Sequence, residues 1–432
     1  MEKQKMDQLT AVLRDTCGLA TGCTEPIAAA FAIARAAEEL DGDQEIQEIH
    51  LTVDPGLYKN AMCVGIPGVE ERGLVFACAL GAVVRDSSKQ LRLLEDLGEE
   101  QIHKAQRFAA EKKISITVKQ EREKLYIEAA VKTASDTVHI LVLDNHQNVV
   151  RLQKNGDWQV DAGDGKKEKG AHPLWTYGLA ELIDYAKEVP MERIDFLKEG
   201  VLLDEQMAEE GLEKGHGFGP ILNQMFADGT EQETMATRAQ MLCASAAEAR
   251  MSGVSKPVMA SAGSGNHGLT VFLTSLGAAE VMHCGEETLI RSLALSNLIT
   301  AYVKSYTGTL SAMCGCGVAA GVGASAGVAF MLGGNEAQIY RALVNMVGSI
   351  AGLLCDGGKE GCAYKVALSS GWAVQSAVMA VKGGTIDIGN GILAQDMKQL
   401  FCNLGKCADA MIPLNRTIID ILEEKQPGHA AE

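Results

Sequence analysis

The sequence predicts an α+β protein that is mostly helical, in which a large helical body carries a smaller α/β unit. Apolar residues recur at helical spacing through most of the chain, whereas alternation with a period of two is confined to one stretch before residue 155. The 432 residues are 47% hydrophobic and 22% charged, proportions that are ordinary for a globular protein. This composition excludes wholesale disorder.

The chain opens with two predicted helices. Residues 6–16 form the first. The turn at 22–26 opens the second, because Thr24 can cap a helix and Pro26 suits a first helical turn. The alanine-rich residues 27–40 are strong helix formers and continue it.

The following segment mixes helices and strands. Further helices are expected at 72–84, which is apolar, and at 99–112, which is amphipathic, with a turn at Pro55-Gly56. Strands are expected where the sequence suits a half-buried surface, at 46–53, 61–66, 114–118, 125–131, 137–143 and 148–152.

These elements divide the chain into parts. Residues 43–155 form the α/β subdomain, and the polar, glycine-rich residues 156–169 form a linker loop. Residues 1–42 and 170–432 form the helical body. From residue 174 onward almost every segment reads as helix, with many small residues that let backbones approach closely.

Charge and hydropathy limit the classes of partner that the protein can bind. The net charge is -17, from 56 acidic and 39 basic side chains, and such a surface repels phosphate backbones. We therefore expect no nucleic-acid partner. The first 15 residues lack the apolar core of a signal peptide, and residues 318–334 are too short and too small-sided to span a bilayer well. We expect a cytoplasmic protein without a membrane partner, and a homo-oligomer is compatible with the small-residue helices.

The cysteines give the first functional indication. A disulfide framework is a poor interpretation for a long cytosolic chain, so most cysteines should be small buried hydrophobic residues and a subset could bind metal. The twelve are Cys17, Cys23, Cys63, Cys78, Cys243, Cys284, Cys314, Cys316, Cys355, Cys362, Cys402 and Cys407.

Two cysteine pairs lie in glycine-rich breaks between helical segments. Cys314 and Cys316 form one pair, and Cys355 and Cys362 form the other. Neither spacing is that of a zinc finger. Thiolates in such breaks suit soft metals and iron–sulfur clusters, and buried structural cysteines are the alternative interpretation.

Two further features are candidates for a reactive group and a binding loop. Cys23 precedes a predicted helix start, a position that lowers a thiol pKa and favours a reactive thiolate; a buried loop cysteine is the alternative. Residues 263–268 have the spacing G-x-G-x-x-G before an apolar run. A nicotinamide site would need a preceding strand and a βαβ context, so a tight turn between helices or a cradle for a carboxylate or phosphate is favoured.

Five motifs, in order along nearly the whole chain, resemble those of the L-cysteine desulfidases, a family of oxygen-sensitive iron–sulfur lyases. The resemblance extends more distantly to the catalytic subunit of iron–sulfur L-serine dehydratases. The motifs are GCTEP at 22–26, PGLYKN at 55–60, GSGNHG at 263–268, LSAMCGCG at 310–317 and LLCDGGKEGCAYKV at 353–366.

The resemblance implies a [4Fe-4S] cluster held by three cysteines. The matching positions are Cys314, Cys355 and Cys362, with Cys316 as an extra thiol that leaves the first ligand open between the two. Cys23 matches the family cysteine that acts as a catalytic base or as a fourth, exchangeable ligand. The helical part would then be the catalytic body.

The implied activity is β-elimination of L-cysteine to pyruvate, sulfide and ammonia. L-serine dehydratase by the same mechanism is one alternative, and a non-catalytic protein that binds an iron–sulfur cluster or a small anion is another; formation of pyruvate separates them. The substrate carboxylate needs a seat rich in N–H groups or positive charge. The candidates are Gly263, Ser264, Gly265, Asn266 and His267, with Lys59, Asn60 and Arg250 as helpers.

Overall fold

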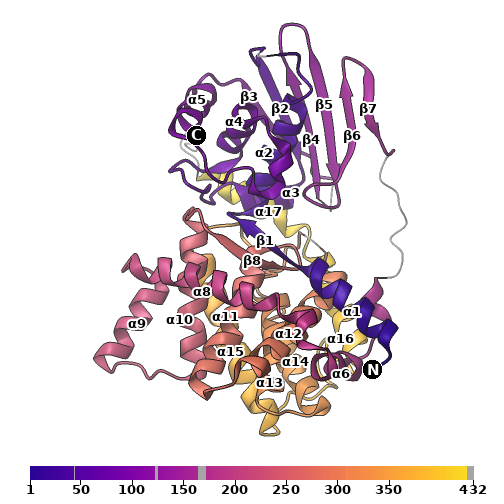
Figure 1. Ribbon diagram of the computed structural model, residues 1–432, viewed down its shortest axis with the longest axis vertical. Helices are drawn as coiled ribbons and strands as arrows, with labels where there is room; N and C mark the ends of the chain where they lie inside the picture. The colour runs from indigo at the N-terminus through magenta and orange to yellow at the C-terminus, as the bar shows by residue number, and fades with distance from the viewer. Residues whose placement is uncertain (43, 122–124, 164–171, 309, 426–432) are drawn as a thin grey trace.

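The computed structural model describes residues 1–42, 44–121, 125–163, 172–308 and 310–425. It confirms the predicted class, because a mostly helical body carries a smaller unit in which helices cover a sheet. Figure 1 shows the sheet unit above the helical body. The chain begins in the helical body, and its last helix, α17 (Leu414–Glu424), lies beside the sheet unit.

The sheet of the upper unit has six strands in the order β3-β2-β4-β5-β6-β7. β2 pairs in parallel with β3, and the other neighbours are antiparallel. The strands are β2 (Glu48–Val53), β3 (Ile114–Val118), β4 (Tyr126–Lys132), β5 (Thr137–Leu143), β6 (Val149–Lys154) and β7 (Asp157–Asp161).

Helices cover one face of this sheet. α2 (Thr24–Ala37) packs on β4 and β5, and α4 (Gly73–Val84) packs on α2 and on α5 (Glu99–Ala110). The alanines of α2 let the backbones approach so closely that a Cβ on Gly81 would lie 2.3 Å from the carbonyl oxygen of Ala30. Small side chains therefore set the spacing of this layer.

The helical body is built around long helices whose small residues are almost all buried. α13 (Val318–Met331), for example, buries every one of its glycines, alanines and valines. The helices of the body are α1 (Lys3–Thr16), α6 (Leu179–Glu188), α7 (Met191–Ile194), α8 (Leu197–Glu213), α9 (Phe218–Asp228), α10 (Met235–Met251), α11 (Gly265–Met282), α12 (Glu286–Thr307), α13 (Val318–Met331), α14 (Glu336–Ile350), α15 (Cys362–Val381) and α16 (Met397–Ala410).

The body also contains a two-stranded antiparallel ribbon that the sequence did not predict. β1 (Cys17–Thr21) pairs with β8 (Pro257–Ser261). The segments CGLAT and PVMAS do not alternate apolar and polar residues, so the sequence carries no clear strand signal at either. In this ribbon Thr21 pairs with Pro257 and Cys17 pairs with Ser261, so the turn at 22–26 and the glycine-rich loop leave it at opposite ends.

Three local predictions were wrong. Residues 61–66 do not form a strand, and Pro55-Gly56 does not form a simple turn: it opens the short helix α3 (Pro55–Ala61), whose N-cap Asp54 accepts a hydrogen bond from the amide of Leu57 at 2.9 Å. Thr24 is not the N-cap of α2 either; Cys23 occupies that position.

Two segments lie differently from the expected division of the chain. Residues 157–161, expected in the linker loop, form the edge strand β7. Residues 24–37, expected in the helical body, cover the sheet as α2. Residue 43 and residues 164–169, where the expected boundaries fall, lie outside the described residues.

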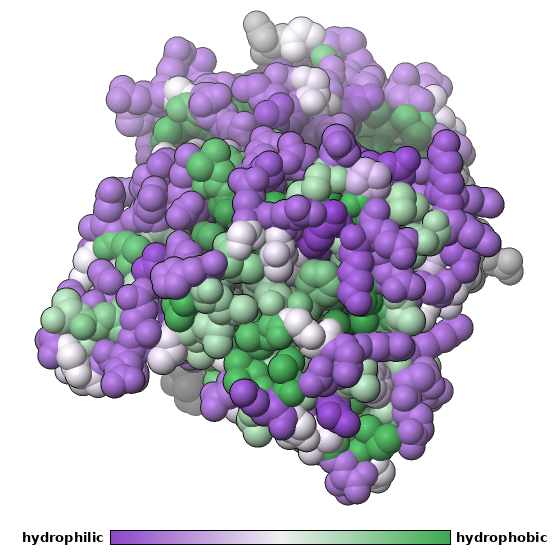
Figure 2. Space-filling model, turned by 60° about the horizontal axis from the view of Figure 1, so that its bottom comes forward, coloured by the Kyte–Doolittle hydropathy of each residue, from purple (hydrophilic) through white to green (hydrophobic). Residues whose placement is uncertain are grey.

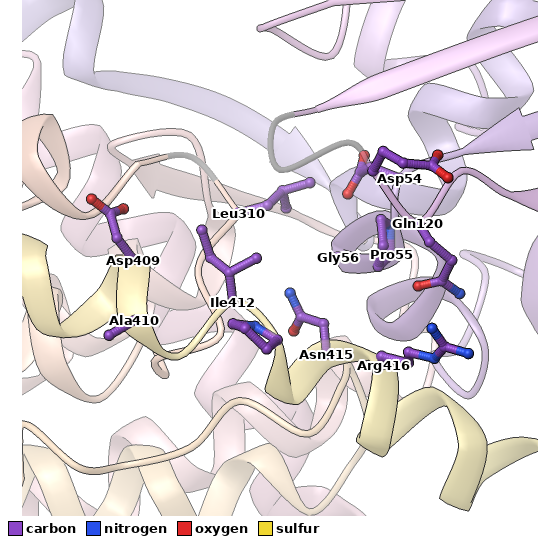
Figure 3. A pocket seen from close by; sticks show the side chains of 12 residues that line it. Asp54, Pro55, Gly56, Gln120, Leu310, Asp409, Ala410, Ile412, Asn415 and Arg416 are labelled. Atoms are coloured by element: carbon purple, nitrogen blue, oxygen red, sulfur yellow. The ribbon is translucent and has the colours of Figure 1, made fainter.

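The last helix, α17, follows the helical body in the chain and contacts the upper unit. α17 packs against α3 of the upper unit, and between them lies a pocket of about 390 Å³ (Figure 3). Of its charged lining residues, Asp54 precedes α3 and Arg416 belongs to α17, and Asn415 points into the pocket from the start of α17.

The surface is largely hydrophilic, as the net charge leads one to expect. Figure 2 shows apolar side chains gathered in the middle of the face it presents. Of the large apolar side chains that are exposed, Tyr364, Leu368 and Met379 lie on α15. In the described part of the chain, no helix combines the length and the apolar character that crossing a membrane requires.

Candidate active site

The two glycine-rich cysteine segments lie side by side. Met313 and Leu354 form an antiparallel β-bridge. The amide of Cys314 donates to the carbonyl oxygen of Leu353 at 2.7 Å, and the amide of Cys355 donates to that of Ala312 at 2.8 Å. These main-chain bonds fix Cys314 and Cys355 as neighbours although 41 positions separate them (355 − 314).

These segments, the turn at 22–26 and the start of α11 surround one cavity. Of the predicted residues, it is lined by Cys23, Asn60, Arg250, Ser264, Asn266, Cys314, Cys316, Cys355 and Cys362. Five thiols therefore meet in one place. The other lining residues are Thr24, Glu25, Met251, Gly315, Asp356, Gly357, Gly358 and Lys365.

Four predicted residues do not line this cavity. Gly265 lies against the Arg250 guanidinium, and Gly263 lines a neighbouring cavity of about 590 Å³. His267 is buried, and its Nδ1 lies 3.1 Å from the carbonyl oxygen of Ser261. Burial lowers the pKa of His267 to about 3, so the ring is neutral. The fourth is Lys59, whose ammonium donates to the main-chain carbonyl of Cys355 at 2.8 Å.

Helix starts converge on the cavity. Cys23 and Ser264 are the N-caps of α2 and α11, Cys362 is the first residue of α15, and Cys314 and Cys316 immediately precede α13. The N-terminus of a helix carries partial positive charge and unpaired N–H groups. The cavity is therefore suited to an anionic occupant.

A hydrogen-bonded chain runs along one wall. The thiol of Cys23 donates to Oε2 of Glu25 at 2.9 Å, and the amide nitrogen of Asn60 donates to Oε1 at 2.9 Å. On its other side, Asn60 accepts from the thiol of Cys355 at 3.6 Å. Glu25 and Asn60 thus connect the isolated thiol to the paired cysteine segments.

The environment of Cys23 differs from the prediction. Burial raises the pKa of its thiol well above the usual value, and the Glu25 carboxylate raises it further. The expected lowering by the helix start is therefore wrong for this arrangement, in which Cys23 is a thiol. Burial by itself raises the pKa of Glu25, but the interaction with His146 and the hydrogen bonds from Cys23 and Asn60 outweigh burial and lower it.

Arg250 provides a cationic group beside the turn at 22–26. It is almost fully buried; one of its nitrogens, Nη1, donates to Oδ1 of Asn266 at 2.8 Å, and Nη2 donates to the carbonyl oxygen of Gly22. Its Nε is buried without a hydrogen-bond partner among the described residues. The guanidinium therefore joins Gly22 of the turn to Asn266 of the glycine-rich loop. Its Nε–H remains available to a ligand.

The glycine-rich loop follows a strand, β8, which the sequence favoured only weakly. That strand belongs to an antiparallel ribbon and not to a parallel βαβ unit. A Cβ on Gly268 would lie 1.6 Å from the carbonyl oxygen of Met259, so this glycine permits α11 to pack on β8. The arrangement supports the interpretation as a turn or anion cradle over that of a nicotinamide site.

Sequence reasoning missed two charged or titratable side chains near the cavity. His146, in the turn between β5 and β6, is 6% exposed, and its Nε2 has no hydrogen-bond partner among the described residues. It interacts electrostatically with Glu25 and Lys304. Burial lowers the pKa of Lys304 to about 8, against the opposing effect of Cys316 and Cys355. Neither residue lies in a motif, so nothing in the sequence pointed to them.

Two other missed residues did carry a signal. Asp356 and Lys365 lie inside the segment 353–366 that contains the second cysteine pair. Lys365 donates to the carbonyl oxygen of Leu354 at 2.6 Å and pairs with Asp356, which also pairs with Lys359. Burial alone would raise the pKa of Asp356, but the two lysines lower it to about 2. Glu25, within the motif at 22–26, could have been found in the same way.

The cysteines around the cavity are the donor type that an iron–sulfur cluster takes. In the part of the chain that the structure describes, no three histidine, cysteine, aspartate or glutamate side chains are arranged to hold one ion. A cluster is larger than an ion and is held by thiolates spread around it. Cys314, Cys316, Cys355 and Cys362 supply such donors around one cavity, beside the cations of Arg250 and Lys365.

Comparisons with known proteins give a consistent result. A family model described as the serine dehydratase alpha chain matches residues 88–419. A UPF0597 protein of Clostridioides difficile is 40% identical over 93% of this chain and 95% of its own length. UPF0597 proteins of Clostridium tetani and Caldanaerobacter subterraneus are 37% and 38% identical, over 96% and 97% of this chain and 98% of their own lengths.

Proposed function

Because this chain belongs to the serine dehydratase alpha chain family, we propose that it is an iron–sulfur-dependent amino-acid lyase. The observation that carries the proposal is the convergence of five thiols from three distant segments on one cavity that also contains Arg250. Cysteines that serve only as small hydrophobic residues have no need to gather in a charged cavity.

We infer that Cys314, Cys355 and Cys362 hold a [4Fe-4S] cluster and that Cys316 is an accessory thiol. With three cysteine ligands, such a cluster supplies a Lewis-acidic iron that makes a bound sulfur or oxygen a better leaving group. The main-chain bonds between the two cysteine segments support Cys314 as the first ligand, since they hold it beside Cys355. The partial positive charge of the converging helix starts would stabilise the negative charge of the cysteine thiolates that hold the cluster.

The substrate's carboxylate would bind at Arg250. Arg250 offers the unpaired Nε–H, and Asn266 and Ser264 line the same cavity. A guanidinium forms strong, directional hydrogen bonds with a carboxylate. This seat would fix the amino acid with its α-carbon inside the cavity.

Cys23 and Glu25 would remove the α-proton together. The thiol proton of Cys23 passes to Glu25, to which it is already hydrogen-bonded at 2.9 Å. The resulting thiolate takes the α-proton, the C–H electron pair becomes the second bond between Cα and Cβ, and the Cβ–S pair leaves with sulfur. The aminoacrylate formed then tautomerises to an imine, which water hydrolyses to pyruvate and ammonia.

His146 would accept the proton that reaches Glu25. Its Nε2 is buried and has no partner among the described residues, and its charge interaction with Glu25 indicates proximity. Burial lowers the pKa of His146, so its ring is neutral near pH 7 and able to take a proton.

We favour L-cysteine as the substrate, converted with one water to pyruvate, hydrogen sulfide and ammonia. The motifs at 22–26 and 353–366 support this choice through their resemblance to the L-cysteine desulfidases. L-serine, which would lose water in place of hydrogen sulfide, is the alternative within the same mechanism. A protein that binds a cluster or a small anion without catalysis is the alternative outside it.

The decisive experiment measures iron and acid-labile sulfide in protein purified without oxygen, and then pyruvate released from L-cysteine and from L-serine. We expect about four iron and four sulfide per chain. With L-cysteine, pyruvate and sulfide should appear in equal amounts. Faster pyruvate release from L-serine would make the chain a serine dehydratase.

Other results would overturn the proposal. A full complement of iron without pyruvate from either amino acid would indicate a non-catalytic iron–sulfur protein. Absence of iron after anaerobic reconstitution would contradict the lyase proposal. The cavity would then be interpreted as a binding site for a small anion.

A further inference from the structure

Lys59 is a buried cation whose direct hydrogen-bond partners are neutral. Its side chain is only 1% exposed. Its Nζ donates to the carbonyl oxygen of Cys355 at 2.8 Å and to Oδ1 of Asn415 at 2.9 Å. Burying a charge is costly unless opposite charge compensates it. A negative centre beyond Cys355 would provide that compensation.

The backbone around Lys59 also holds the segment 355–362. The amide of Gly358 donates to the carbonyl oxygen of Asn60 at 3.2 Å. A Cβ on Gly357 would lie 2.6 Å from the carbonyl oxygen of Lys59. α3 and the cysteine segment are therefore in backbone contact, and the Lys59 ammonium adds a third attachment at Cys355.

The second partner of Lys59 comes from the last helix. Asn415 lies in the first turn of α17 and is almost fully buried. Figure 3 shows its side chain pointing from α17 into the pocket between α17 and α3. Lys59 thus sits where α3, α17 and the Cys355 segment meet.

We propose that Lys59 is a positioning residue that fixes Cys355 and places a positive charge behind it, so that cluster retention and reduction potential depend on the contact between α3 and α17. This role rests on the proposed function, because it assumes a cluster at Cys355. It assigns Lys59 to the protein side of Cys355, away from the substrate to which the sequence had assigned it.

The test compares Lys59→Met, Asn415→Asp and the control Lys256→Met, a surface lysine paired with Glu210. Lys59→Met removes the charge and both hydrogen bonds. Asn415→Asp keeps an acceptor for Lys59 and adds a negative charge. The variants are compared as anaerobically loaded protein, by the rate of iron loss to a chelator and by the reduction potential of the cluster.

We expect Lys59→Met to lose iron about tenfold faster than the wild type, the scale of effect seen when outer partners of metal ligands are removed. Both Lys59→Met and Asn415→Asp should have more negative potentials, since less positive charge disfavours the reduced cluster. Lys256→Met should match the wild type in both measurements. An unchanged potential in Asn415→Asp would overturn the proposal, whatever happens to folding.

A measurement on iron-free protein separates this proposal from the proposed function. Hydrogen exchange of the amides at 355–362 should be faster in Lys59→Met than in the wild type, while exchange in α10 stays the same. If the wild type binds no iron at all, the lyase proposal fails. The comparison of hydrogen exchange in the wild type and Lys59→Met still tests whether Lys59 positions the segment 355–362. Equal exchange at 355–362 would overturn that role.

Discussion

The carboxylate of Glu25 accepts the thiol proton of Cys23, with 2.9 Å between Sγ and Oε2. The two residues belong to the same turn, at the start of a helix that covers the sheet of the upper unit. The upper unit therefore supplies a hydrogen-bonded thiol and carboxylate to a cavity whose other thiols come from the helical body.

This pair predicts how the site responds to substitution. Cys23→Ala should abolish pyruvate formation, and Glu25→Gln should slow it about 100-fold or more, because each removes one half of the proton transfer. Iron content should stay at the wild-type level in both. Cys63→Ala, which changes an exposed thiol, serves as the control. Loss of iron in Cys23→Ala would identify Cys23 as a ligand and not as a base.

The paired segments predict which cysteines retain iron. Serine at Cys314, Cys355 or Cys362 should remove most of the bound iron, because a hydroxyl is a poor ligand for a cluster built on thiolates. Serine at Cys316 should leave it bound, and serine at Cys407, on α16, should have no effect. If Cys316→Ser loses iron and Cys314→Ser keeps it, the first ligand has been assigned to the wrong member of the pair.

The wall that contains Arg250 predicts the binding of substrate. Asn266→Asp places a second carboxylate where the substrate's own carboxylate should bind, so KM should rise about tenfold or more through repulsion of like charges. The kcat and the iron content should change little. Asn266→Ala, which removes the amide without adding charge, should raise KM less; equal effects of the two variants would argue against a carboxylate seat.

The glycines of the second cysteine segment predict a steric effect. A Cβ on Gly358 would lie 2.6 Å from the carbonyl oxygen of Asn60, whereas a Cβ on Gly352 meets no atom within 4 Å. Gly358→Ala should therefore cost about 1–3 kcal/mol in the free energy of unfolding and weaken iron retention. Gly352→Ala should be close to neutral in thermal unfolding, and a similar loss in both variants would contradict the close contact.

Asp54 predicts a pH dependence of stability. Burial raises its pKa from 3.8 to about 6, even though the amides of Leu57 and Tyr126 donate to it. The folded state therefore holds this proton more tightly than the unfolded state. Its contribution is full below pH 3.8 and is lost as the pH rises to about 6, a change of about 3 kcal/mol.

Asp54→Asn lacks this titration. Urea unfolding from pH 4 to 7 should show the variant gaining stability relative to the wild type over that interval. A difference between the two proteins that stays constant with pH would show that Asp54 does not titrate in this range.

Much of the fold was accessible from the sequence because its signals are local. The alternation in 114–118 and 137–143 and the alanine-rich run after Pro26 each report the environment of their own residues. The ribbon of β1 and β8 was missed because two five-residue strands far apart in sequence carry little periodicity. The helix at 55–61 was missed because a Pro-Gly pair is typical of a turn, whereas this helix depends on the N-cap Asp54 that precedes the proline.

The residues of the candidate site also fall into those that local sequence motifs indicate and those that only the tertiary structure brings together. The cysteines of the site and Asn266 lie in motifs, and they do meet in one cavity. Arg250, expected as a helper for the substrate carboxylate, lies outside the motifs but lines the same cavity. His146 and Lys304 come from a turn and a long helix without a motif, and only tertiary contacts bring them near. The pKa of Cys23 was predicted in the wrong direction, because a helix start can be recognised from sequence whereas burial beside a carboxylate cannot.

The contact between Lys59 and Asn415 has a consequence for biosynthesis. Lys59 reaches Cys355 from an early segment of the chain, yet its other partner is made after all four cysteines of the paired segments. A nascent chain that still lacks residue 415 would leave the Lys59 ammonium with only one of its two hydrogen-bond partners, the carbonyl of Cys355. We therefore expect stable iron retention to follow translation of α17, and premature termination before it to yield a protein that loses iron faster than the full chain.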